Sequence, residues 1–252
     1  MINKNDLKFF QKFGYLTIKN LIPKKDIKKC FESAKKIKKD KKSKKNEISK
    51  YYEKSVLKKD REILVRVENF FGKDKNLTKL IKNKKILYIL KKLFGEKAVI
   101  FKEKINYKLP GCRQDKLHQD SQAGWGKYCK NFISVLISLE KSDLSNGCLQ
   151  FDISGNNSKK LITKSMKPLK YENLKKPKFK SFIMSPGDSV FFNNFIPHKS
   201  NSNKSRKSRI QVYLTFNKKS DGNFRLEYIR NKEVFYPPNN KRQKGINYTY
   251  KV

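Results

Sequence analysis

The chain has 252 residues and a formal net charge of +40, from 62 Lys and Arg against 22 Asp and Glu. Hydrophobic residues make up 37% of it, which excludes a chain disordered throughout and allows one sizeable core. The longest apolar run, 132–139, is too short to cross a bilayer, and the four cysteines show neither Cys-x-x-Cys spacing nor a disulfide framework. We expect a single-domain cytoplasmic protein with no membrane partner.

The net charge allows two interpretations. A basic surface attracts nucleic acid through counterion release, but lysine spread over nearly every segment equally indicates a compositional bias. The lysine run 38–50 has no apolar periodicity and favours a solvated segment over a nucleic-acid tail. We expect no specific nucleic-acid partner, and the charge favours an anionic small-molecule substrate.

The first hundred residues show mainly helical periodicity. Asn5 or Asp6 is expected to cap a short helix that Gly14 ends, and Pro23 is expected to begin a second helix. A third helical pattern runs over 77–94. Short strands are predicted at 15–18 and 63–69. The helices are expected to buttress a sheet.

From residue 99 the apolar period changes from 3.6 to 2. Strands are predicted over 99–107, 132–139, 147–151, 181–184, 189–192 and 209–216. In the last strand Arg209 shares a polar face with Gln211 and Tyr213, while Ile210 and Val212 begin the apolar face. Several short strands separated by turn signals predict a β sandwich or barrel.

Two histidines and one aspartate carry the main functional signal. His118 and Asp120 point to the same side of an extended strand, and His198 is the only other histidine. Together they would form a 2-His-1-carboxylate triad, which leaves open positions on non-haem Fe(II). Because His-x-Asp also occurs often by chance, this motif alone does not establish a metal site. Arg209 supports the interpretation, since its planar guanidinium is suited to bind a small dicarboxylate inside a barrel.

These motifs together resemble the phytanoyl-CoA dioxygenase family. The resemblance covers about residues 101–216 and rests on 118–120, 146–149, 186–192, 198–200 and Arg209. It implies a mainly β fold, a double-stranded β-helix (jelly roll) buttressed by N-terminal helices. It also implies one oxygenase domain, with helical support in 1–97, the β-helix in 98–217 and a C-terminal extension in 218–252.

The resemblance further implies cofactors and a reaction. Fe(II) would be held by His118, Asp120 and His198. The cosubstrate 2-oxoglutarate would be held by Arg209 with Ser200, and the pocket completed by Lys104 and Asn106. With dioxygen the expected outcome is hydroxylation of a C–H bond in a small anionic or zwitterionic metabolite, with release of succinate and CO2. Related halogenases carry Gly or Ala in place of Asp120, so its presence favours an alcohol product.

Candidate substrate contacts are Lys102, Gln119 and Trp125. Lys102 shares a strand face with Lys104 and Asn106, where a lysine would meet a carboxylate or phosphoryl group, although exposed lysines are common throughout this chain. Gln119 and Trp125 lie beside the metal motif, and packing beneath a loop explains Trp125 equally well.

The segments 101–111, 123–125 and 236–238 further resemble a bacterial branch of the family that includes dioxygenases of 2-aminoethylphosphonate. The family often has Gly-Ser/Thr-His where this chain has 154–156, so a wall contact made there is in doubt. Two other functions stay open, an oxygenase acting on a macromolecule such as nucleic acid and a non-catalytic β-helix binding protein. The oligomeric state is not readable from the sequence.

Overall fold

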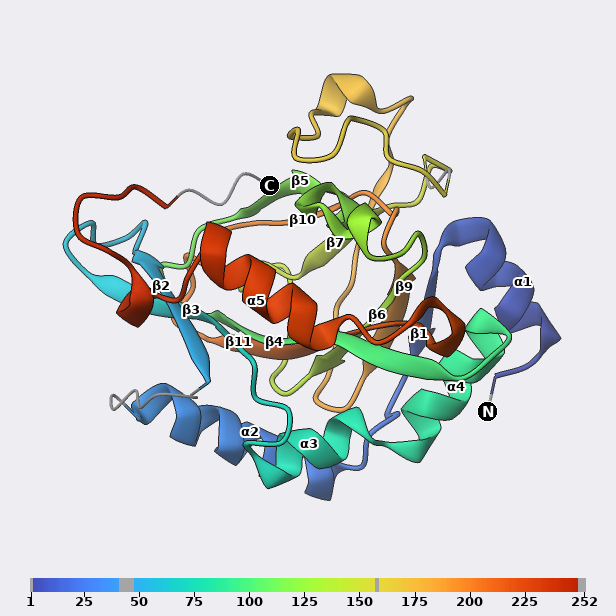
Figure 1. The fold of residues 1–252 in the computed structure, drawn as a ribbon, viewed down its shortest axis with the longest axis horizontal. Coiled ribbons are helices and arrows are strands. Elements are labelled where there is room, and N and C mark those ends of the chain that lie inside the picture. Colours follow the sequence, from blue (N-terminus) through green and yellow to red (C-terminus); the bar gives the residue numbers. More distant parts are fainter. Residues whose placement is uncertain (1, 41–47, 157–158, 249–252) are drawn as a thin grey trace.

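The computed structural model describes residues 2–40, 48–156 and 159–248 and consists of two antiparallel β-sheets with helices on the outside (Figure 1). The larger sheet has seven strands in the order β1-β9-β6-β11-β4-β3-β2, and the smaller has the order β5-β10-β7-β8. The strands of the larger sheet are β1 (Tyr15–Ile18), β2 (Ser49–Lys54), β3 (Glu62–Glu68), β4 (Ala98–Lys108), β6 (Ile133–Ser138), β9 (Ser189–Asn193) and β11 (Arg209–Lys218). Those of the smaller sheet are β5 (Asp115–His118), β7 (Leu149–Asp152), β8 (Phe179–Ser181) and β10 (His198–Ser200).

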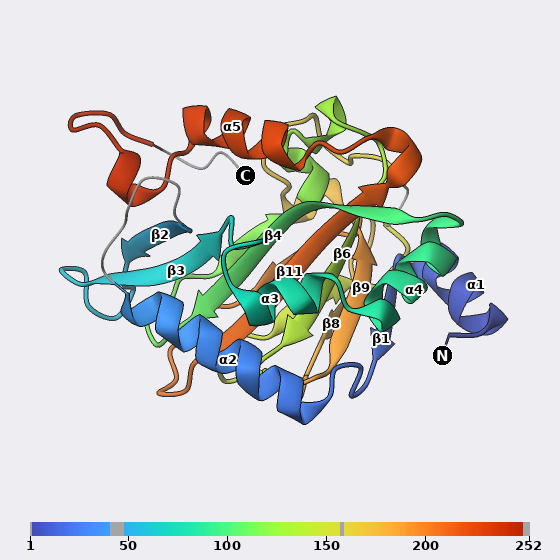
Figure 2. The same ribbon diagram turned by 60° about the horizontal axis from the view of Figure 1, so that its bottom comes forward.

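Four N-terminal helices lie on one face of the larger sheet, where Figure 2 shows α2, α3 and α4 packed against the strands. The helices are α1 (Lys4–Phe13), α2 (Lys24–Lys39), α3 (Lys75–Ile81), α4 (Lys84–Phe94) and, near the C-terminus, α5 (Arg225–Phe235). The main apolar core joins the four N-terminal helices to the outer face of β11, as the alternating pattern predicts: Ile210, Val212, Leu214 and Phe216 all belong to it. The helices therefore buttress the sheet as expected.

The opposite face of the larger sheet is turned toward the smaller sheet. Tyr213 on β11 packs there with Leu149 and Phe151 on β7 and with Phe192 on β9. Two facing antiparallel sheets closed in this way form the double-stranded β-helix, so the predicted fold class is confirmed. The metal motif lies on the smaller sheet, with its side chains directed between the two layers.

The differences from the predicted elements have local causes. The pattern over 77–94 forms two helices, because Asn83 accepts hydrogen bonds from the amides of Lys85 and Ile86 and starts a new helix. Asn3, and not Asn5 or Asp6, caps the first helix, with Asp6 closing a capping box. The strand β2 and the helix α5 were not predicted.

No helix among the described residues is long and apolar enough to cross a membrane. Part of the lysine run, 41–47, and the end of the C-terminal extension, 249–252, lie outside the described residues.

Candidate metal centre and its cavity

The structure brings the three predicted metal ligands together. The Nε2 atoms of His118 and His198 lie 4.0 Å and 3.9 Å from Oδ1 of Asp120, and the three ligand atoms all lie within 4.8 Å of one another. One ion with bonds of about 2 Å contacts all three after a small inward shift. Asp120, however, is not on the strand: β5 ends at His118, and Asp120 begins the short 3-10 helix Asp120–Ala123.

Both imidazole rings are oriented by the main chain. Nδ1 of His118 bonds to the carbonyl of Lys116 at 2.7 Å, and Nδ1 of His198 bonds to the carbonyl of Ile196 at 2.9 Å. With the proton on Nδ1, each Nε2 is left as a lone-pair donor. Burial and the neighbouring His118 lower the pKa of His198 to about 4, so its ring is neutral at ordinary pH and ready to bind a metal.

The Asp120 carboxylate is oriented by one hydroxyl, that of Ser134, which the sequence did not single out. Ser134 on β6 donates to Oδ2 of Asp120 at 3.3 Å, and Ser134 also bonds to Thr215 on β11 at 2.8 Å. Oδ1 is therefore the oxygen turned toward the histidines. Burial alone would raise the pKa of Asp120, but His198 and Lys104 outweigh it and lower the pKa, which keeps the carboxylate ionised. The sequence feature that could have identified Ser134 is its position as a serine among the apolar residues of β6.

The triad opens onto a cavity of about 670 Å³. Seven of the predicted site residues line it: Lys102, Lys104, Asn106, His118, Asp120, Trp125 and His198. Its other walls include Arg66 on β3, Tyr213 on β11 and Leu169 in the loop before β8. This volume is large enough for a cosubstrate and a second small molecule side by side.

One wall of the cavity is strongly basic. Arg66 (3.3 Å), Lys102 (3.7 Å) and Lys232 (2.5 Å) all pair with the buried carboxylate of Glu68. Lys104 forms no ion pair with any described carboxylate, and its Nζ lies 4.6 Å from the centre of the Tyr213 ring. Burial and the neighbouring Lys102 lower the pKa of Lys104 to about 8. Positive charge thus exceeds negative charge on this wall.

The predicted binders of the distal carboxylate are more deeply buried. Arg209 is 1% exposed; its Nη1 donates to Gln211 at 3.0 Å, and its Nε has no hydrogen-bond partner among the described residues. Ser200 is also buried and bonds to Asp115. Neither Arg209 nor Ser200 lines the cavity, whereas Asp115 and Lys108 do.

Of Gln119 and Trp125, the two residues expected beside the metal motif as substrate contacts, only Trp125 lines the cavity. The Gln119 side chain does not line the cavity: it is fully buried, donates to the carbonyls of Phe195 and Lys160, and accepts from the amide of Ile162. With its amide engaged in this way, Gln119 holds a loop and does not reach a substrate in the cavity. Trp125 does line the cavity, and its buried Nε1 has no hydrogen-bond partner among the described residues.

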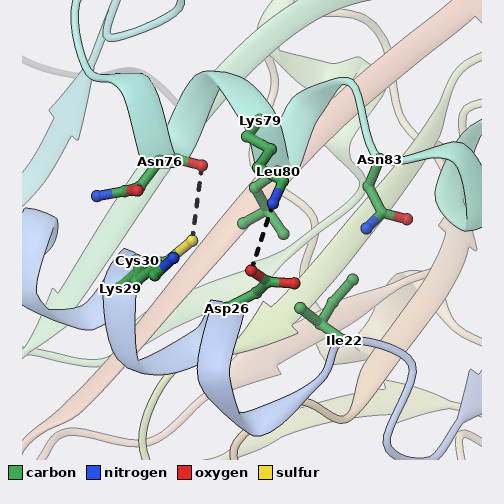
Figure 3. Close-up of a pocket in the computed structure, with 8 residues that line it drawn as sticks. All are labelled: Ile22, Asp26, Lys29, Cys30, Asn76, Lys79, Leu80 and Asn83. Atoms are coloured by element: carbon green, nitrogen blue, oxygen red, sulfur yellow. Dashed lines mark hydrogen bonds and ion pairs between the residues drawn. The ribbon is translucent and has the colours of Figure 1, made fainter.

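A second pocket lies on the far side of the larger sheet, between α2 and α3 (Figure 3). Its volume is about 20 Å³, which holds roughly one water molecule. Cys30 donates there to the carbonyl of Asn76, and Asp26 pairs with Lys79 at 3.6 Å. The pocket is a packing gap between two helices.

Comparison with known proteins supports the same family. The sequence signature of phytanoyl-CoA dioxygenase (PhyH) matches residues 10–211. The 2-aminoethylphosphonate dioxygenase of an uncultured bacterium is 34% identical over 187 residues, which cover 74% of this chain and 71% of the relative. Methylphosphonate hydroxylase of Gimesia maris is 34% identical over 140 residues, 56% of this chain and 53% of the relative.

Among solved structures, EctD from S. alaskensis with 2-oxoglutarate and 5-hydroxyectoine superposes with a TM-score of 0.71 at 15% identity, covering 87% of this chain and 77% of that one. This likeness supports the double-stranded β-helix. Since the family signature spans well over half of the sequence, the chain belongs to the phytanoyl-CoA dioxygenase family and is a non-haem Fe(II)/2-oxoglutarate-dependent dioxygenase.

Proposed function

We propose that this dioxygenase hydroxylates a C–H bond of a small metabolite that carries a phosphonate or a comparable dianionic group, with release of succinate and CO2. The observation that carries the proposal is the surplus of buried positive charge in the cavity of the triad. Removing a cation from water costs free energy unless an anion pairs with it, and Lys104 forms no ion pair with a described carboxylate, so this wall is suited to an anion supplied by a ligand.

The metal-binding role of His118, Asp120 and His198 is supported by the donor set. Two imidazoles and one carboxylate meet from two segments, and all three residues line the cavity. These ligands suit Fe(II), which with 2-oxoglutarate and dioxygen supplies the oxidising power for hydroxylation. The chain contributes ligand orientation, through the two main-chain carbonyls and the Ser134 hydroxyl.

The cosubstrate-binding role of Arg209 is supported by its surroundings. A guanidinium that is buried, lacks a partner at Nε and forms no ion pair with a described carboxylate has a donor ready for a ligand carboxylate. Tyr213 and Gln211 beside it are neutral and hold it in place. Burial raises the pKa of Tyr213, so its phenol stays protonated and able to donate.

We assign substrate binding to Lys102 and Trp125 and also to Lys104, which the sequence analysis placed in the cosubstrate pocket and which lines the same cavity. Lys102 lies 5.4 Å from the centre of the Trp125 ring, and the indole N–H adds a neutral donor to the two ammonium groups. Asn106, one step along the same strand face, supplies a further amide at the cavity surface. Ammonium and N–H donors around one point suit the three oxygens of a phosphonate. The names of the two relatives point to the same substrate class.

The test has two stages. Anaerobic titration of the Fe(II)-loaded protein with 2-oxoglutarate should produce the weak visible charge-transfer band of the chelate. Succinate release is then measured with three compounds of equal length, 2-aminoethylphosphonate, taurine and β-alanine, which differ in the acidic group. We expect the phosphonate to stimulate turnover most. Equal stimulation by the carboxylate, or none by any anion, would contradict the substrate class.

A further inference from the structure

Asp115 occupies the position in front of the predicted cosubstrate anchor. Its Oδ2 accepts from the Ser200 hydroxyl at 2.5 Å and from Lys108 Nζ at 3.0 Å. Lys108 also donates to the Ser200 oxygen at 2.8 Å, so the three side chains form a closed triangle. Arg209 is close enough to lower the pKa of Asp115.

The triangle leaves no donor for a second carboxylate at Ser200. A serine hydroxyl has a single proton, and that proton is directed at Asp115. Asp115 and Lys108 border the cavity, whereas Ser200 and Arg209 do not. A carboxylate that enters from the cavity therefore meets Asp115 before it reaches Ser200 and Arg209.

On the basis of the proposed function, we propose that Asp115 and the distal carboxylate of 2-oxoglutarate compete for the same donors, Ser200 and Lys108, so that the cosubstrate binds by displacing Asp115. The exchange replaces one carboxylate with another, and the number of charges around Lys108 and Arg209 stays the same. Asp115 thereby sets the threshold concentration of cosubstrate and rejects weaker monocarboxylates.

The position of Asp115 in the chain allows this movement. It is the first residue of β5, and its side chain is 41% exposed, compared with 3% for Lys108. The partial loss of water around Asp115 would raise its pKa, but Lys108, the Ser200 hydrogen bond and the nearby Arg113 outweigh this effect and lower the pKa well below its usual range. Arg113, two residues earlier and half-exposed, is already paired with Glu53, so the displaced carboxylate would turn toward solvent.

The alternative is a fixed ion pair, in which Asp115 holds Lys108 and Ser200 in position for the cosubstrate. The two roles predict opposite effects of Asp115→Asn on the affinity for 2-oxoglutarate. Under competition, Asp115→Asn removes the competing negative charge from Ser200 and Lys108 and tightens 2-oxoglutarate binding, whereas Lys108→Gln weakens it. Under a positioning role, both substitutions weaken binding.

The experiment measures 2-oxoglutarate affinity directly, by anaerobic titration of the Fe(II)-loaded protein and by the thermal stabilisation that 2-oxoglutarate gives. We expect Asp115→Asn to lower the Kd at least about tenfold, the effect of freeing one charge-assisted hydrogen bond. Asp115→Ser, which also lacks the carboxylate, should do the same if the Asn variant folds poorly. An unchanged or higher Kd in the folded variant overturns the proposal.

Glu62→Gln is the matched control. Glu62 is an exposed carboxylate bordering the same cavity on β3, so its loss reports the general effect of removing one negative charge. A Kd lowered equally in Glu62→Gln and Asp115→Asn would refute a specific competition. If the wild-type protein shows no band at saturating 2-oxoglutarate, the proposed function itself fails. If it binds normally and Asp115→Asn binds no better, only the competition fails.

Discussion

His118 and His198 lie directly opposite each other in the β5–β10 pair, with their ring centres 4.1 Å apart. Each ring is fixed by the main-chain carbonyl two residues earlier in the chain. Strand register, more than side-chain packing, therefore sets the distance between the two Nε2 atoms. A register shift of one residue would turn one imidazole out of the site.

His198→Ala and Asp120→Ala should remove the metal site. Each substitution leaves only two of the three metal ligands, so we expect the charge-transfer band to be lost. Succinate release should fall at least about 100-fold, which is more than is typical when a residue that hydrogen-bonds to a metal ligand is replaced. Thermal unfolding compared with Glu172→Gln, which changes an exposed carboxylate, tests whether the variants remain folded. A band of wild-type intensity in either variant would show that the ligands are assigned wrongly.

Ser134→Ala should weaken metal binding without removing a ligand. The substitution deletes the hydroxyl that holds Oδ2 of Asp120, and outer hydrogen bonds of this kind contribute about 10- to 100-fold in metal affinity. Fe(II) affinity is measured by competition with a chelator, with the exposed Ser145→Ala as control. Equal affinities of the two variants would mean that Ser134 does not position the carboxylate.

Lys104→Met should change the pH dependence of substrate capture. The lowered pKa of about 8 means that Lys104 loses its proton, and its attraction for an anion, as the pH rises through 8. We expect kcat/KM of the wild type to fall above pH 8. In Lys104→Met, kcat/KM should be low at every pH and should show no such decrease above pH 8. Lys91→Met on α4 serves as control. If kcat/KM of Lys104→Met still decreases above pH 8, the decrease is caused by another titrating side chain.

Glu68→Gln should destabilise the fold. The change leaves Arg66, Lys102 and Lys232 without their shared carboxylate, and breaking a buried pair costs about 3–5 kcal/mol. Burial alone would raise the pKa of Glu68, but Lys232 and Lys102 lower it below its unfolded value. The stabilisation is therefore present above the unfolded pKa and is lost as the pH falls toward the folded pKa.

Urea unfolding at several pH values measures the loss, with Glu32→Gln in an exposed pair on α2 as the control expected to change little. A small change for Glu68→Gln at neutral pH would show that solvent reaches the cluster.

The sequence predicted the strands best where one face is apolar. The alternation over 209–216 identified both faces of β11, and the two histidines identified the site. The two elements that were not predicted, β2 and α5, depend on distant partners. The strand β2 has little apolar pattern and is fixed by pairing with β3. The helix α5 is held by buried ion pairs from Arg225 to Glu103 and from Lys232 to Glu68. No local pattern marks such pairs.

The same limit applies within the site. Gln119 was expected at the substrate because it lies between two ligands, but alternation along the chain turns its amide to the opposite side. Ser134 and Asp115 were missed because their roles arise from contacts with residues 14 and 85 positions away.

The amide of Gln119 ties the loop at Lys160 and Ile162 to the turn that separates His118 from Asp120. That loop leads to Leu169 at the cavity wall, and Gln122 in the same turn bonds to Thr163 and Lys167. The cavity wall at Leu169 and the turn between His118 and Asp120 are thus linked through Gln119 and Gln122, so a molecule that displaces this wall would also change the distance between the two ligands.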